Sequence, residues 1–160
     1  MDRSSLEAVV LYLEGDGIRH LAPHGRQTVR APWDPDLDPH EVIVDAVAAL
    51  ELAPIMVHST SWRVVRDLIV LTFLVVVERP ERVPDACEVR LVARAELARG
   101  RATGPPPQVR LSQVVEHGLR HLAWLLRGDE AIHQALADWS RALSEYEPEP
   151  FRAFGREPGS

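Results

Sequence analysis

DPHEVIVDAVAALELAP, residues 38–54, decides the fold of this chain, because it has the pattern of a capped helix that ends at a proline. Asp38 suits the N-cap position, and Pro39 suits the first helical position, where a missing N–H costs nothing. Glu41 can reach back to complete a capping box. Residues 42–52 are apolar on nearly every side, which predicts a helix buried on more than one face.

Two strands are predicted directly after this helix, paired as a hairpin. The first, IMVHSTSWR at residues 55–63, alternates between two faces. One face is expected to carry Met56, His58, Thr60 and Trp62, and the other Val57, Ser59, Ser61 and Arg63. The second, LIVLTFLVVV at residues 68–77, has almost no polar residue. It therefore reads as a central strand covered on both faces.

Shorter segments complete the expected sheet. Strands are predicted at residues 8–13, 18–22, 27–30 and 88–93, with a glycine-containing hairpin turn at residues 15–17. A helical turn is expected at residues 94–99, followed by a proline-rich connector at residues 104–107.

Two amphipathic helices are expected at the C-terminal end. The first has an apolar stripe formed by Leu111, Val114, Val115, Gly118, Leu119, Leu122, Leu125 and Leu126. The second has a stripe formed by Ile132, Leu136, Trp139, Leu143 and Tyr146. Gly128 as C′ and Asp129 as the next N-cap predict an αα-hairpin.

Together these elements predict an α+β fold: a mixed, mostly antiparallel sheet with a capped helix and a C-terminal αα-hairpin. We expect residues 1–147 to form a single globular domain and residues 148–160 to be a weakly ordered tail.

Composition excludes several classes of protein. A net charge of −6 argues against nucleic-acid binding, and the longest apolar run, residues 68–77, is too short to span a membrane as a helix. Cys87 is the only cysteine, so no intramolecular disulfide can form. No secretory signal is visible at the start of the sequence. We therefore expect a soluble cytoplasmic protein.

The order of strand, hairpin, loop, capped helix, two long strands and C-terminal helix resembles the Nudix fold. Asp36-Leu37-Asp38-Pro39-His40-Glu41 lies where that family has Gly-Glu-Ser-Pro-Glu-Glu entering its catalytic helix. The resemblance covers about residues 5–99. It implies a diphosphate hydrolase in which glutamates of this helix hold divalent metal.

The residues of the Nudix signature, G-x5-E-x7-R-E-U-x-E-E-x-G-U, are absent from this sequence. In register, the first glycine and glutamate become Ala31 and Leu37, the Arg-Glu pair becomes Asp45 and Ala46, the Glu-Glu pair becomes Ala49 and Leu50, and the closing glycine becomes Leu52. Alanine and leucine supply no oxygen ligand to a hard cation. We therefore expect no Nudix-type hydrolysis, no catalytic residue, no metal site and no cofactor.

Candidate sites remain outside the signature. His58, Thr60, Trp62 and Arg63 form a predicted ligand-binding site, since tryptophan offers a stacking surface and histidine and arginine offer polar contacts. The alternative is that Trp62 is a packing residue and His58 is an interfacial residue with its hydrogen bonds satisfied. His117 and His121 lie one helical turn apart, but a boundary pair is favoured over a metal site because no third ligand accompanies them.

The function favoured by the sequence is a non-catalytic, Nudix-like binding or regulatory domain that forms a homodimer. The dimer is predicted from surplus apolar surface, with Trp124 or Trp139 anchoring an interface at the C-terminal helices. A small-molecule ligand or a protein is the expected further partner.

Two alternative functions remain. One is an enzyme acting on a small nucleotide-like substrate through residues outside the lost signature, and the other is a structural subunit of a larger assembly.

Overall fold

The computed structural model describes residues 4–96 and 109–149. The chain divides into two compact units, residues 1–93 and 94–160, which are described separately below. The single domain predicted over residues 1–147 stays a prediction. The predicted connector at residues 104–107 and the tail beyond residue 149 lie outside the described residues.

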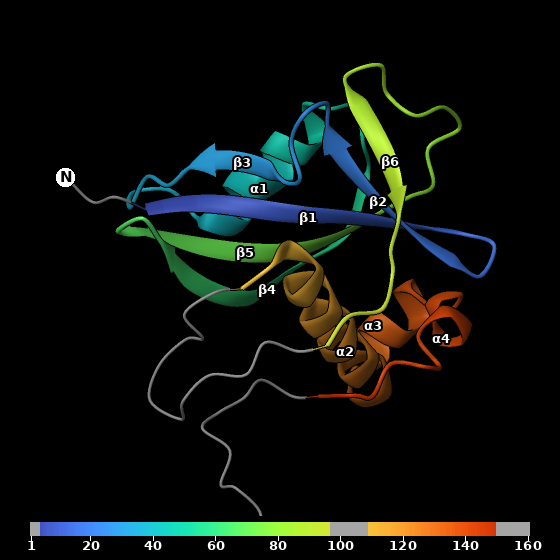
Figure 1. Cartoon of the computed structure of the whole chain (residues 1–160). Helices are drawn as coiled ribbons and strands as arrows, with labels where there is room; N and C mark the ends of the chain where they lie inside the picture. Colours follow the sequence, from blue (N-terminus) through green and yellow to red (C-terminus); the bar gives the residue numbers. More distant parts are fainter. Residues whose placement is uncertain (1–3, 97–108, 150–160) are drawn as a thin grey trace, which may run out of the picture. The chain divides into compact units, whose positions relative to one another are not determined.

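The first unit is built on a six-stranded sheet within the described part of the chain (Figure 1). Its strand order is β4-β5-β1-β2-β6, and β3 pairs with the first half of β1 on the same edge as β2. The pair β1–β5 is parallel and the other pairs are antiparallel. The strands are β1 (Ser4–Glu14), β2 (Gly17–Pro23), β3 (Val29–Pro32), β4 (Pro54–Val65), β5 (Leu68–Val77) and β6 (Cys87–Leu91). The mixed, mostly antiparallel sheet predicted from the sequence is confirmed.

The apolar content of the strands explains the order of the sheet. Strand β5 is buried continuously from Thr72 to Val77, as predicted for a central strand without alternation. Strand β1, its parallel neighbour, is buried from Leu6 to Tyr12. Strand β3 begins two residues later than predicted, at Val29.

Helix α1 (Pro39–Ala48) begins as the sequence predicts. The side chain of Asp38 accepts a hydrogen bond of 2.8 Å from the amide of His40, and Pro39 occupies the first helical position. No bond from Glu41 back to Asp38 is found among the described residues, so only one half of the predicted capping box forms. The element order of the Nudix resemblance is confirmed over this unit.

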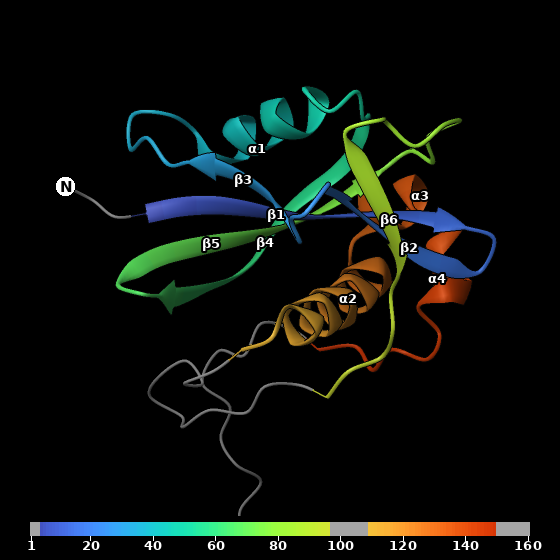
Figure 2. The ribbon, with the colours of Figure 1, turned by 45° about the horizontal axis from the view of Figure 1, so that its top comes forward.

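The burial of α1 differs from the prediction of a helix covered on more than one face. Only Ile43 and Val47 of the helix are fully buried, while Ala48 and Ala49 are exposed. Figure 2 shows the reason: α1 lies over one face of the sheet. Its buried residues join a core with alternate residues of β1 and β5, including Leu6, Ala8, Val10, Phe73 and Val75.

The second unit contains α2 (Leu111–Gly128), α3 (Glu130–Ala135) and α4 (Trp139–Ala142). The predicted first helix is confirmed, but the predicted second helix is broken by a turn at residues 136–138. Asp129 caps α3 by accepting bonds from Ala131 and Ile132 at 2.9 and 3.1 Å. Gly128 ends α2 as its last helical residue and not in the left-handed conformation expected at C′.

The apolar stripe of the broken helix is retained, because Leu136, Trp139, Leu143 and Tyr146 are all buried. Trp139 is therefore not exposed to anchor a partner, whereas 42% of Trp124 is exposed. Residues 94–96 form no helix, and the remainder of the turn predicted at residues 94–99 lies outside the described residues. Within the described part, no helix combines the length and apolar character needed to cross a bilayer.

Candidate functional site

Strand β4, which carries the predicted ligand-binding residues, has two register shifts against β5. One lies near its start, between Pro54 and Met56, and the other is a bulge among the predicted site residues. Ser59 pairs with Phe73 of β5, but Ser61 pairs with Thr72, so Thr60 is the extra residue. A one-residue slip moves every later side chain to the other face of the sheet. The predicted alternation therefore holds up to Ser59 and is reversed after Thr60.

The reversal separates His58 from Trp62, which were expected to share a face. His58 pairs with Leu74, and Arg63 pairs with Val70, so both lie on the face opposite α1. Trp62 pairs with Leu71, which packs against the core on the α1 face. Thr60 is buried and donates a hydrogen bond of 3.3 Å to the carbonyl of Thr72. Binding of a ligand by these four residues stays a prediction.

Arg63 meets a buried carboxylate on this second face. Its Nη1 donates to Oε1 of Glu7 and, at 2.9 Å, to Oγ1 of Thr72. Thr72 in turn donates to the same Glu7 oxygen at 2.8 Å, and Thr28 donates to the other at 3.5 Å. We call Glu7, Arg63, Thr72 and Thr28 the Glu7 cluster.

The side chains of the central ion pair in the Glu7 cluster are largely withdrawn from solvent. The side chain of Glu7 is 1% exposed and that of Arg63 is 17% exposed. A carboxylate this deeply buried requires a cation and further hydrogen bonds to offset its desolvation. The geometry supplies both, so the guanidinium of Arg63 is committed to Glu7. This ion pair connects β1 to the part of β4 that follows the bulge.

Apolar side chains are exposed on the α1 face beyond the bulge. Trp62 and Val64 on β4 are 56% and 52% exposed, and Ile69, which pairs with Val64, is 43% exposed. We call Trp62, Val64 and Ile69 the hairpin patch. Trp62 is thus not part of the buried core, although part of its side chain is covered. An exposed cluster of large apolar side chains is typical of a surface that binds a partner.

His58 is half-buried at the other end of β4. Burial lowers its pKa, and the nearby His40 lowers it further. Nε2 of His40 lies 3.2 Å from the carbonyl oxygen of Val57, which connects the start of α1 to β4. His58 is therefore neutral near pH 7. In this form it can take part in hydrogen bonds but carries no positive charge.

The structure also tests the signature register on α1. Glu51, just after the helix, has a φ of +63°, the left-handed conformation that glycine most often supplies at a helix end. In the register given above, the closing glycine falls one position later, at Leu52. Moving the register back by one residue places Glu51 there, and the Glu-Glu pair then becomes Ala48 and Ala49.

Both registers leave the central metal-binding positions without carboxylates. The shifted register places carboxylates at the two other glutamates of the signature, Asp36 at the first and Asp45 in the Arg-Glu pair. The unshifted register places Leu37 and Ala46 there. Within residues 4–96 and 109–149, no three His, Cys, Asp or Glu side chains are grouped so that they could hold a metal ion. Neither register restores the Glu-Glu pair of the signature, which is replaced by alanine and leucine or by two alanines.

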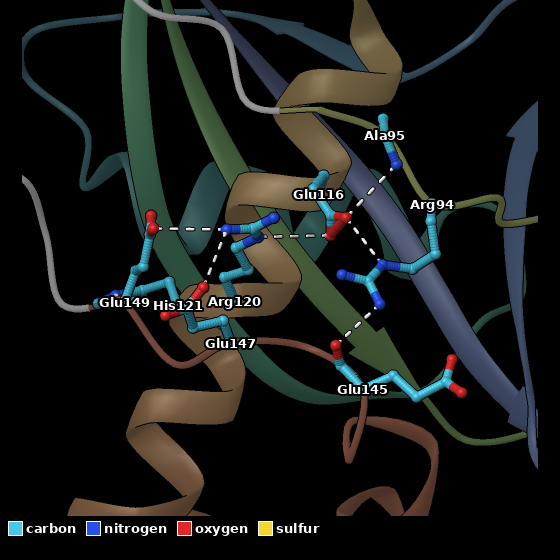
Figure 3. Close-up of polar contacts among 8 residues, drawn as sticks. All are labelled: Arg94, Ala95, Glu116, Arg120, His121, Glu145, Glu147 and Glu149. Atoms are coloured by element: carbon cyan, nitrogen blue, oxygen red, sulfur yellow. Dashed lines mark hydrogen bonds and ion pairs between the residues drawn. The ribbon is translucent and has the colours of Figure 1, made fainter.

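A second buried ionic cluster lies within the second unit (Figure 3). The Glu116 side chain on α2 is 1% exposed and accepts a bond of 2.8 Å from Nε of Arg94. Arg120, one turn along α2, lies 3.8 Å from Glu116 and 3.4 Å from Glu149. The guanidinium of Arg94 also stacks 4.1 Å above the ring of Tyr146.

This Glu116 cluster joins α2 to two flanking segments. Arg94 donates to the carbonyl of Glu145 at 2.8 Å, and the amide of Glu149 donates to the carbonyl of Arg120 at 3.2 Å. His121 is buried, lies 3.3 Å from the Glu149 carbonyl through Nδ1, and stacks on Trp124. These contacts explain His121 as a structural residue that secures residues 145–149 to α2.

Sequence reasoning missed both buried glutamates. Glu7 stands in the otherwise apolar SSLEAVVLYLE, where a lone charge within a buried strand is a signal for an internal ion pair. Glu116 precedes Arg120 by four residues on a helix, the spacing of an ion pair on one helical face. Neither signal identifies the distant partner, Arg63 or Arg94.

A concave region of about 460 Å³ lies at the C-terminal end of α2, between this helix and α3 and α4. Charged and polar side chains line it, among them Arg127, Glu130, His133 and Ser144. None of the predicted ligand-binding residues contributes to it. Cys87 lies elsewhere in a buried position, and burial raises the pKa of its thiol, which makes it a poor nucleophile.

No protein-family model matches this sequence, and no curated protein matches it. Several solved structures are similar to this chain, and three of them are as follows. The Ap4A hydrolase of C. elegans is 10% identical over 57% of this chain and 82% of that protein, with a TM-score of 0.42. A protein of Chromobacterium violaceum assigned to the nudix hydrolase family is 13% identical over 88% and 94%, with a TM-score of 0.47. The M. smegmatis Nudix hydrolase RenU is 14% identical over 56% and 70%, with a TM-score of 0.33.

The Nudix-like element order of this chain rests on its own strands and on the capped helix α1.

Proposed function

We propose that this chain is a non-catalytic binding or regulatory domain of Nudix-like fold that acts as a homodimer. The observation that carries the proposal is the composition of α1. In either register, alanine or leucine occupies the positions where the signature has its Glu-Glu pair. A helix with this composition cannot hold divalent metal against a diphosphate in the way the signature implies.

Two further observations support association as the role of the domain. The hairpin patch exposes apolar side chains that lie on the sheet, away from the buried core. Glu7, Arg63 and Glu116 are committed to buried ion pairs, so these three side chains are not available to a substrate. The hairpin patch is the accessible feature that supports binding of a partner.

The test is a hydrolysis assay with the purified chain. Nucleoside diphosphate derivatives, including a dinucleoside polyphosphate and a nucleotide sugar, are incubated with the protein and magnesium, and released phosphate or nucleotide is measured. We expect no release above the blank without protein. Release that disappears when a chelator is added would contradict the non-catalytic role.

A further inference from the structure

The outermost strand of the first unit combines an open edge with exposed apolar side chains. Strand β4 ends the strand order β4-β5-β1-β2-β6, so one of its edges pairs with no other strand in the part of the chain that the structure describes. Such an edge presents unpaired N–H and C=O groups, which another strand can satisfy by joining the sheet. The chemistry of this edge therefore specifies a β-strand as its partner.

The part of β4 beyond the bulge is suited to this pairing. From Ser61 to Val65, each residue pairs with β5 without a register shift, ending at Val65 and Leu68. A regular strand of this kind extends a sheet more readily than the bulged part around Thr60, which is twisted and locally unpaired. The chain contains no lysine, the residue most often used to protect an edge.

The charge of this segment does not prevent self-association. Arg63 is its only charged residue, and the guanidinium is directed into the Glu7 cluster. Two copies of the strand could thus lie side by side without placing two uncompensated positive charges together. An inward-directed charge often discourages pairing, but here Glu7 neutralises it within the same chain.

We propose that residues 61–65 of β4 form a homodimer interface by pairing antiparallel with the same residues of a second copy. This inference rests on the homodimer of the proposed function and identifies its surface. In a two-fold arrangement centred on Arg63, Trp62 lies opposite Val64 of the second copy, on the same face of the extended sheet. The two hairpin patches then join into one apolar surface.

This register follows from the side-chain pattern. Moving the partner strand by one residue would place its Trp62 on the opposite face, away from the hairpin patch. The contact is small, because each copy contributes five strand residues and three exposed apolar side chains. It falls at the low end of specific interfaces, below about 1,200 Å², the size class of weak and transient complexes.

The experiment is sedimentation equilibrium of the full chain across the micromolar range, comparing the wild type with two matched variants. W62E places a charge in the hairpin patch. W124E makes the same change in charge at an exposed tryptophan of α2, the anchor predicted from the sequence. V64K, at a second exposed position of the patch, provides an independent test, and chemical denaturation checks that each variant is folded.

We expect a wild-type dimer, a dissociation constant at least about tenfold higher in W62E and V64K, and no change in W124E. Amide hydrogen exchange at residues 61–65 should slow as the wild-type concentration rises. A dimer lost in W124E but retained in W62E would overturn this interface and leave the homodimer intact. A wild-type monomer throughout would overturn both, whatever the hydrolysis assay shows.

Discussion

At the scale of single residues, the Glu7–Arg63 pair is the polar feature of the first unit with a large desolvation cost. Both side chains are largely withdrawn from water, with exposed fractions of 1% and 17%. A buried ion pair adds little stability relative to an apolar pair, but loss of one partner leaves an uncompensated charge. The pair is therefore better understood as a connection between β1 and β4 than as a source of stability.

Arg63→Met should lower the free energy of unfolding by about 3 kcal/mol, because Glu7 is left buried without its cation. The measurement is chemical denaturation. Arg79→Met is the control: Arg79 pairs with Glu14 at the surface, where a loss of no more than about 1 kcal/mol is expected. The double variant Glu7→Gln/Arg63→Met should recover part of the loss. Equal effects of the two single variants would contradict the role given to the Glu7 cluster.

A second residue-scale prediction concerns pH. Burial lowers the pKa of His20, and the nearby Arg90 lowers it further. Below about pH 6.5, the unfolded chain binds a proton at this position before the folded chain does. The free energy of unfolding should therefore fall as the pH decreases from about 7 to about 5.5.

The measurement is the urea midpoint at both pH values for the wild type and His20→Gln. The variant should lose less stability between them, because it lacks this titrating group. His58 and the other histidines remain in both proteins and cancel in the comparison. Identical pH dependence of the two midpoints would show that His20 does not contribute.

At the scale of elements, the β4–β5 hairpin has a turn of unusual composition. Arg66 and Asp67 connect the paired residues Val65 and Leu68, and both have positive φ, at 49° and 64°. Two-residue hairpin turns with positive φ at both positions favour Asn-Gly or Asp-Gly. Arginine and aspartate adopt this conformation at a cost.

Asp67→Gly should raise the free energy of unfolding by about 0.5–1 kcal/mol, since glycine removes the steric cost of positive φ but loses more entropy on folding. Chemical denaturation measures the change. Asp16→Gly, in the β1–β2 turn beside the positive-φ Gly15, is the control, because Asp16 does not have positive φ itself. A larger gain in the control would contradict this explanation.

The elements also show which parts of the fold are predictable from sequence. The start of α1 is predictable because Asp38 and Pro39 act through neighbouring backbone groups. The end is not, because Glu51 takes the left-handed conformation without being glycine. The bulge at Thr60 is also hidden, since a β-branched residue suits a regular strand equally well. The break between α3 and α4 leaves the spacing of the apolar residues unchanged, so this spacing does not predict it.

At the scale of the whole molecule, the sequence predicts the sheet and its central strands but not the candidate site. Alternation and apolar runs depend on local order, and they correctly identify β4 and β5 as a hairpin. Whether Trp62 and Arg63 share a face with His58 depends on one extra residue in β4, Thr60. The Glu7 cluster depends on a contact between side chains 56 residues apart, which a single sequence does not encode as a local pattern.

The central claim, that the metal chemistry implied by the Nudix resemblance is absent, concerns the chain as a whole. Its most direct test is titration of the purified protein with Mn²⁺, followed by the electron paramagnetic resonance signal of the free ion. This measurement detects metal binding without requiring the correct substrate. We predict that the free-ion signal in the presence of protein equals that of buffer alone. A saturable loss of signal that magnesium reverses would contradict the account.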